Sequence, residues 1–175
     1  NSAAFRKLPG TKLLNDATGE LVYLPPQDHE TIVSLMNNLE KFINADTMMD
    51  ADPLLKMAII HHQFESIHPF YDGNGITGRI INILYLILDD LLVSPTLYLS
   101  DYIINNKSDY YRLLQEVRAK NSWEDWILYM LRAVEETARE TIAQIKAIQK
   151  LFISTQEKIK KEAPKAYDKE LIEIL

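Results

Sequence analysis

From residue 28 onward, apolar positions recur at the spacing of helices that bury one face. Ile32, Leu35, Leu39 and Phe42 fall on one such stripe, and Asp28 precedes it as a helix N-cap. Asp52 followed by proline predicts the start of a second helix, which runs toward Pro69. Apolar residues dominate again from about Asn74. Ser100, Ser108 and Ser122 are expected to cap later helices. The pattern predicts a mostly α-helical protein.

The two ends of the chain follow different patterns. Residues 12–14 and 20–24 are short apolar runs around a turn that contains Asn15, Asp16 and Gly19, which predicts a β-hairpin over about 12–24. After Ser122 no helix breaker occurs before Pro164, so one helix of about 40 residues, or two shorter ones, is predicted there. Because the chain opens without methionine, we expect a fragment, and residues 167–175 are interpreted as the start of a further module.

Composition excludes several classes of function. The formal net charge of −6 argues against a general nucleic-acid-binding protein. The absence of cysteine removes disulfides and thiolate chemistry, and it fits a reducing, cytoplasmic environment. The most apolar stretch, 76–93, contains Arg79, Asn82, Asp89 and Asp90, so we expect no membrane span.

One segment, residues 68–79, concentrates groups suited to phosphate chemistry. It reads His-Pro-Phe-Tyr-Asp-Gly-Asn-Gly-Ile-Thr-Gly-Arg and holds three of the five glycines in the chain. A histidine can exchange a proton near neutral pH, and a Gly-Asn-Gly turn before a helix presents backbone N–H groups to an anion. A glycine-rich turn alone is often only a tight turn, so the evidence lies in the whole segment.

This segment resembles the signature of the Fic family, His-x-Phe-x-(Asp/Glu)-Gly-Asn-Gly-Arg-x-x-Arg. The resemblance extends over about residues 5–145 and implies a Fic-fold helical bundle with a hairpin flap at about 12–24 and a catalytic loop at 68–79. We accordingly divide the chain into a Fic domain, 1–145, and a helical extension, 146–175. Most Fic proteins transfer AMP from ATP to a hydroxyl side chain of a target protein, so the resemblance implies a protein adenylyltransferase.

The resemblance also assigns roles to individual residues. His68 would be the general base. Asp72 would bind Mg²⁺ together with the phosphates of ATP. Backbone groups of Gly73, Asn74 and Gly75 would cradle the phosphates, and a final arginine would neutralise them. That arginine is Arg79. Tyr110 and Tyr111 fall where relatives contact adenine, although packing within a helix explains both tyrosines equally well.

The family also implies partners. A target protein would add a strand to the flap, and a homodimer is compatible with the family. Many relatives are restrained by a helix with the pattern Ser/Thr-x-x-x-Glu-Gly/Asn. Since these 175 residues contain no such segment, we expect any inhibitory element to lie upstream or on another chain.

One position departs from the family signature. Ile76 stands where the first arginine is expected, which would weaken the binding of a triphosphate. The alternatives are therefore an impaired adenylyltransferase, a Fic enzyme with another donor group, and a nucleotide-binding or interaction module without turnover. His61 and His62 lack the i,i+4 spacing of a zinc helix, so we expect them to pack beneath the catalytic loop.

Overall fold

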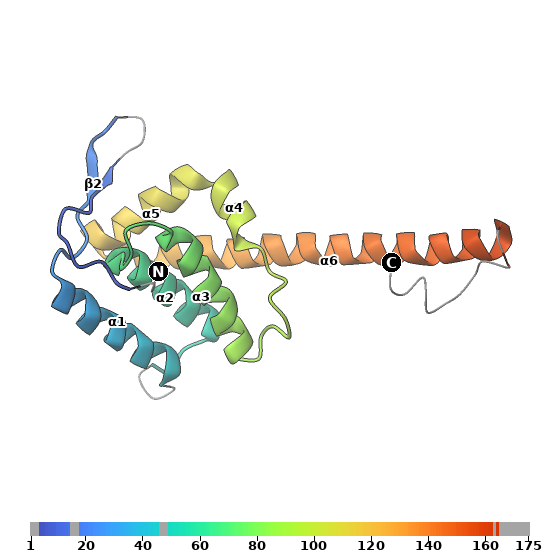
Figure 1. Ribbon diagram of the computed structural model, residues 1–175, viewed down its shortest axis with the longest axis horizontal. Helices are drawn as coiled ribbons and strands as arrows, with labels where there is room; N and C mark the ends of the chain where they lie inside the picture. The colour runs from blue at the N-terminus through green and yellow to red at the C-terminus, as the bar shows by residue number, and fades with distance from the viewer. Residues whose placement is uncertain (1–3, 15–17, 46–48, 163, 165–175) are drawn as a thin grey trace.

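A computed structural model describes residues 4–14, 18–45, 49–162 and 164. Within these residues a short hairpin precedes six helices (Figure 1). The elements are β1 (Leu13–Leu14), β2 (Leu21–Tyr23), α1 (His29–Asn44), α2 (Pro53–Ile67), α3 (Asn74–Leu88), α4 (Leu99–Asn105), α5 (Lys107–Lys120) and α6 (Trp123–Glu162). The predicted mostly α-helical fold is confirmed.

The hairpin predicted over about 12–24 is confirmed as well. Strands β1 and β2 pair antiparallel, with Leu13 opposite Tyr23 and Leu14 opposite Leu21. Gly19 adopts a φ of 70° at the turn, a conformation that glycine reaches without steric cost. Asn15 and Asp16 lie outside the described residues. The hairpin projects from the helical bundle beside α5 (Figure 1).

The first two helices begin where the sequence predicts. The Asp28 carboxylate accepts a hydrogen bond of 2.8 Å from the backbone N–H of Thr31, and the Asp52 carboxylate accepts one of 2.8 Å from that of Leu54. Each bond satisfies one of the backbone donors that a helix leaves unpaired at its N-terminus. The signal is local, since each carboxylate lies within three residues of the backbone N–H that donates to it.

Helix α2 is the centre of the bundle. It packs against α1, α3 and α6, and residues on nearly all of its sides are buried. Trp126 of α6 is fully buried and donates a 2.9 Å hydrogen bond from its indole N–H to the backbone carbonyl of Ala58. Because α2 is held on several sides, the residues at its C-terminal end have little freedom to move.

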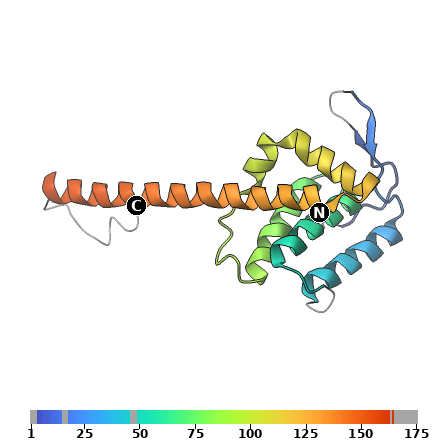
Figure 2. The same cartoon turned by 180° about the vertical axis from the view of Figure 1, so that it is seen from behind.

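Helix α6 is one continuous helix of 40 residues, which decides between the two alternatives for this region. Its first part packs on the bundle through Trp126, Met130 and Ala133, whereas its later part extends beyond the other helices (Figures 1 and 2). No helix among the described residues combines the length and the apolar character that crossing a membrane requires.

The predicted caps at Ser100 and Ser108 are wrong. Helices α4 and α5 begin at Leu99 and Lys107, one residue before these serines, and neither helix has a side-chain cap. The Ser100 hydroxyl instead accepts a 2.7 Å hydrogen bond from Nε of Arg79. The hydroxyl that the local pattern assigns to a cap is thus bonded to Arg79, a residue 21 positions away in the sequence.

The packing of α2 against α3 predicts the effect of an added methyl group. A Cβ at Gly78 would lie 3.0 Å from Oε1 of Glu65, 3.1 Å from Cδ1 of Phe64 and 3.3 Å from Cε1 of His61. We therefore expect Gly78→Ala to lower the free energy of unfolding by about 1–3 kcal/mol in urea titrations. At Gly75 the nearest atom is Nη1 of the flexible Arg79, at 3.3 Å. Gly75→Ala is the matched control, and equal destabilisation by both variants would contradict the prediction.

Candidate active site

The segment 68–79 joins the end of α2 to the start of α3. His68 ends α2 in the left-handed conformation, with φ 49° and ψ 60°, and its backbone N–H donates a 2.9 Å hydrogen bond to the carbonyl of Phe64. Gly73 precedes α3 with φ 79°, where an L side chain would be strained. The turn therefore brings the His68 imidazole and the N-terminus of α3 to the same end of the bundle.

Asn74 fixes the shape of this loop. Its side chain is buried, its Oδ1 accepts a 2.9 Å hydrogen bond from the backbone N–H of Phe70, and its Nδ2 donates a 2.8 Å bond to the Phe70 carbonyl. The amide thus satisfies both backbone groups of one loop residue. The predicted contribution of Asn74 to anion binding can come only from its backbone, because its side chain is engaged in the loop.

The first turn of α3 combines donors with a cation. Backbone N–H groups at a helix N-terminus lack partners within the helix and favour an anion. Nη1 of Arg79 lies 3.3 Å from the position that a Cβ of Gly75 would occupy, so the guanidinium folds back along the helix toward this turn. Ile76 lies in the same turn with 61% of its surface exposed. An arginine at position 76 would therefore have room.

Asp72 supplies the carboxylate of the loop. It is exposed, and its Oδ1 accepts a 2.7 Å hydrogen bond from the backbone N–H of Gly73. The part of the chain that the structure describes contains no cluster of three or more potential metal-binding His, Asp or Glu side chains. A single carboxylate fits Mg²⁺, which commonly takes its other ligands from water and from substrate phosphates. The residues present therefore fit the predicted ion.

His68 is suited to accepting a proton. Its side chain is 14% exposed, and burial together with the charges of Arg6 and Arg118 holds the pKa of the imidazole below its usual value. The ring is therefore neutral near pH 7, which a general base requires. Its Nδ1 lies 3.9 Å from Oε2 of Glu65, a residue of α2 that sequence analysis did not select.

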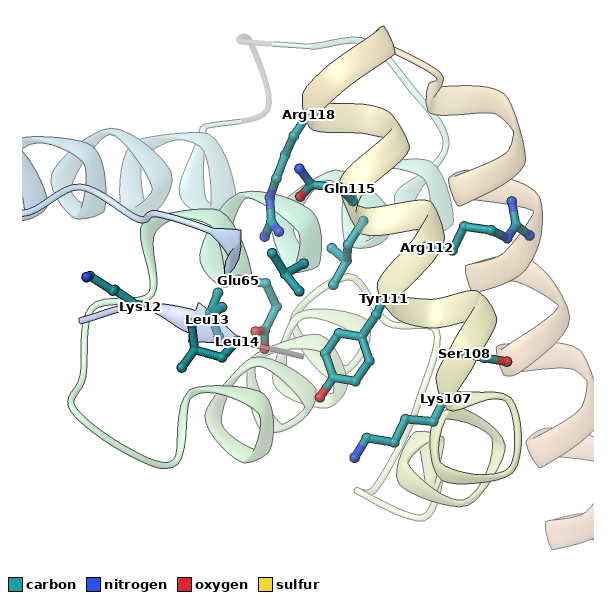
Figure 3. A pocket seen from close by; sticks show the side chains of 12 residues that line it. Lys12, Leu13, Leu14, Glu65, Lys107, Ser108, Tyr111, Arg112, Gln115 and Arg118 are labelled. Atoms are coloured by element: carbon teal, nitrogen blue, oxygen red, sulfur yellow. The ribbon is translucent and has the colours of Figure 1, made fainter. Parts of the chain in front are cut away.

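A cavity of about 890 Å³ lies between the hairpin and α5. In Figure 3, Leu13 and Leu14 lie on one side and Tyr111 on the other, with Glu65 between them. The rim and walls also include several cationic or polar side chains, namely Lys12, Lys107, Arg112, Gln115 and Arg118. The apolar walls suit a flat ring and the cations suit an anion, so the cavity fits a ligand that combines the two. No residue of the 68–79 segment is among its lining residues.

The two adjacent tyrosines lie in different surroundings. Tyr111 lines the cavity. Tyr110 is buried, and its hydroxyl lies 2.8 Å from Nε2 of His61 within a cluster of aromatic rings that includes Trp126. Tyr110 thus has the packing role that sequence analysis offered as one of two alternatives, and an adenine contact by Tyr111 stays a prediction.

The base of the hairpin is attached to the same site. The guanidinium of Arg118 lies over the ring of Tyr23 at 3.8 Å from its centroid, and its Nε donates a 3.1 Å hydrogen bond to Oγ of Ser66. The Tyr23 hydroxyl donates a 2.9 Å bond to the Ser66 carbonyl. Arg118 gives no recognisable signal in the sequence, because its role depends on contacts with a strand and a helix far away along the chain.

Comparisons with known proteins agree with this architecture. Residues 2–86 match the sequence model of the Fic/DOC family. A crystal structure of a Fic family protein from Desulfovibrio desulfuricans G20 is similar over 81% of this chain and 41% of its own, with a TM-score of 0.66 and 26% identity. The chain is similar to the Fic/DOC family over residues 2–86.

Curated relatives of this Fic domain carry the name of an activity. Protein adenylyltransferase fic-1 of Caenorhabditis elegans is 30% identical over 56 residues, which cover 32% of this chain and 11% of the relative. Protein adenylyltransferase Fic of Drosophila melanogaster is 32% identical over 59 residues, which cover 34% of this chain and 12% of the relative. The matched segment is thus a small part of each relative.

Three buried titratable side chains of this Fic domain predict how its stability depends on pH. Burial lowers the pKa of His61 and of His62 to about 4, and burial raises the pKa of Glu65 to about 7. Between about pH 4.5 and 6.5 the two histidines take up protons only on unfolding, whereas Glu65 releases one. We expect a net slope of about 1.4 kcal/mol per pH unit, with stability falling as the pH falls.

Urea titrations at several pH values between 5 and 6.5 measure this slope. In Glu65→Gln the opposing proton is lost, so the slope should roughly double. A stability that is constant or that rises toward pH 5 in both proteins would contradict the assignment of neutral, buried His61 and His62.

Proposed function

We propose that this Fic domain transfers AMP from ATP to a hydroxyl side chain of a target protein. The observation that carries the proposal is that a neutral His68 lies at the same end of the bundle as the first turn of α3, which offers backbone N–H donors and the Arg79 guanidinium. The names of the curated relatives support the same activity. Because the chain spans only a small part of those relatives, the activity is inferred for the domain rather than carried over from whole proteins.

In this mechanism the target oxygen bonds to the α-phosphorus while the bond from that phosphorus to the bridging oxygen of the β-phosphate breaks. Pyrophosphate is the leaving group, and the hydroxyl proton passes to Nε2 of His68. Backbone N–H groups of Asn74 and Gly75 and the guanidinium of Arg79 would stabilise negative charge on the phosphates, joined by the N–H of Gly73 once it releases the Asp72 carboxylate. Asp72 would hold Mg²⁺, which supplies further neutralisation of that charge when it is bound.

The hairpin is the element proposed to present the target. With two strands it has unpaired edges, and an extended segment of another protein can add to such an edge through backbone hydrogen bonds. Tyr23 fastens the hairpin to α2 and α5, so a strand added there would lie close to the cavity. Leu14 and Leu21 are more than half exposed and offer apolar contacts.

Incubation with ATP labelled at the α- or the γ-phosphate tests the proposal. We expect label from the α-position to appear on the protein itself or on proteins of a lysate, and to be lost in His68→Ala, since the hydroxyl proton would have no acceptor. A thermal shift with ATP and Mg²⁺ checks that the variant still folds and binds. Transfer of the γ-label alone would overturn the proposal in favour of phosphoryl transfer, and binding without any transfer would favour an interaction module.

The departure at Ile76 gives a separate prediction. A charge-assisted hydrogen bond from an arginine contributes about 1.5–3 kcal/mol, so Ile76→Arg should tighten ATP binding by about tenfold to a hundredfold in calorimetry. Ile80→Arg is the matched control, because Ile80 is also exposed on α3 but lies one turn farther from its N-terminus. Equal gains in the two variants would reveal a general effect of charge, and no gain at position 76 would contradict the prediction.

A further inference from the structure

We propose that Glu65 is the positioning residue of the general base: its carboxylate accepts the Nδ1–H of His68 and so keeps the lone pair of Nε2 directed at the incoming hydroxyl. The inference rests on the proposed function, in which His68 accepts the proton. It adds a residue outside the 68–79 segment to that step. After proton transfer the imidazolium would face a carboxylate, and the transferred proton would stay on Nε2 until the product leaves.

The first support is the geometry of the two side chains. Glu65 and His68 are separated by three residues at the end of α2, a spacing that places side chains on one helix face. Oε2 of Glu65 lies 3.9 Å from Nδ1 of His68, and the side chains are 9% and 14% exposed. A movement of about 1 Å would bring this pair to the length of a hydrogen bond.

The second support concerns the hydrogen bonds of buried polar atoms in the Glu65 and His68 side chains. Oε1 of Glu65 and Nδ1 of His68 are buried and form no hydrogen bond of normal geometry among the described residues, although the backbone carbonyl of Glu65 acts on the imidazole as an acceptor. An unpaired buried polar atom costs about 1–3 kcal/mol. The 3.9 Å contact of Nδ1 is with Oε2, the other oxygen of the same carboxyl group, so Nδ1 gains a partner when the two side chains move closer. The pair forms when the imidazole carries its proton on Nδ1, which is the tautomer that leaves Nε2 free to act as a base.

The surroundings keep the Glu65 carboxyl in this place. Its Oε1 lies 3.0 Å from the position that a Cβ of Gly78 would occupy and 3.8 Å from the corresponding position at Gly75. The carboxyl is therefore enclosed between α2 and the first turns of α3, beside the cavity that it helps to line. A residue with a Cβ atom at position 78 would therefore occupy space that the Glu65 carboxyl group needs.

The charges around His68 explain why a carboxylate partner is needed. Burial and the nearby Arg6 and Arg118 disfavour a positive imidazolium, which weakens His68 as a proton acceptor. Above about pH 7, where Glu65 is ionised, its negative charge counteracts both effects. The groups that act on this pair are Arg79 of α3, Tyr110 and Arg118 of α5, Arg6 of the N-terminal segment, and the backbone carbonyl of Glu65.

No arginine among the described residues forms an ion pair with Glu65 within 4.0 Å, although Arg79 and Arg118 both act on its charge from a greater distance. The His68 imidazole is thus the nearest basic side chain that the described residues offer this carboxyl group. A carboxylate whose closest partner is the general base, rather than a structural arginine, is free to respond when that base takes up a proton.

Nitrogen NMR of the His68 imidazole in the protein without nucleotide tests the inference apart from activity. At pH 8, above the pKa of Glu65, we expect the Nδ1–H tautomer in the wild type and a smaller share of it in Glu65→Gln, because the neutral amide is a weaker acceptor than the carboxylate. Glu40→Gln, at an exposed position of α1, is the control for net charge and should leave the tautomer unchanged. An Nε2–H tautomer in the wild type, or an unchanged tautomer ratio in Glu65→Gln, would overturn the inference.

Steady-state label transfer supplies the second readout. We expect kcat of Glu65→Gln to fall by about 10- to 100-fold with an unchanged KM for ATP, and its rate to reach a plateau at a lower pH than that of the wild type. A raised KM with an unchanged kcat would instead assign Glu65 to substrate binding and overturn the inference. If the NMR results are as expected but no α-label is transferred by the wild type, the proposed function fails while the pairing of Glu65 with His68 stands.

Discussion

The buried guanidinium of Arg6 is the interaction on which the position of the active site depends. Its Nε donates a 2.8 Å hydrogen bond to the carbonyl of His68, and its Nη2 bonds to the carbonyls of Pro26 and Ile67. A helix leaves its last carbonyls without partners and carries a partial negative charge at that end. Arg6 therefore satisfies the C-terminus of α2 with a cation. The same residue joins the N-terminal segment to the catalytic loop, since its backbone N–H donates to the carbonyl of Pro69.

This arrangement explains why the sequence predicts some features and leaves others hidden. Asp28 and Asp52 start their helices through bonds within three residues, so a local pattern is sufficient to find them. Ser100 fails as a predicted cap because Arg79 competes for its hydroxyl. Adjacent residues on a helix point about 100° apart, so composition alone could not decide which of Tyr110 and Tyr111 faces the cavity.

The residues that support the motif are harder to find than the motif itself. The segment from His68 to Arg79 is recognisable because its glycines, carboxylate and histidine are contiguous in the sequence. Arg6, Glu65 and Arg118 act through contacts whose partners come from several elements, and none of them belongs to a repeated pattern. A sequence can therefore identify the reacting groups of such a site, whereas their electrostatic environment emerges only from the folded chain.

That environment also limits the consequence of Ile76. The missing arginine removes one cation from the first turn of α3, but Arg79 remains in that turn and Lys12, Arg112 and Arg118 line the adjacent cavity. In the proposed function, electrostatic stabilisation of a triphosphate would be shared among these groups, so the loss of one donor would weaken binding without abolishing it. Proton transfer would depend instead on His68 and its immediate neighbours. The departure at position 76 would therefore affect how tightly a nucleotide is held, and the proposed pairing of Glu65 with His68 would affect how readily the bound nucleotide reacts.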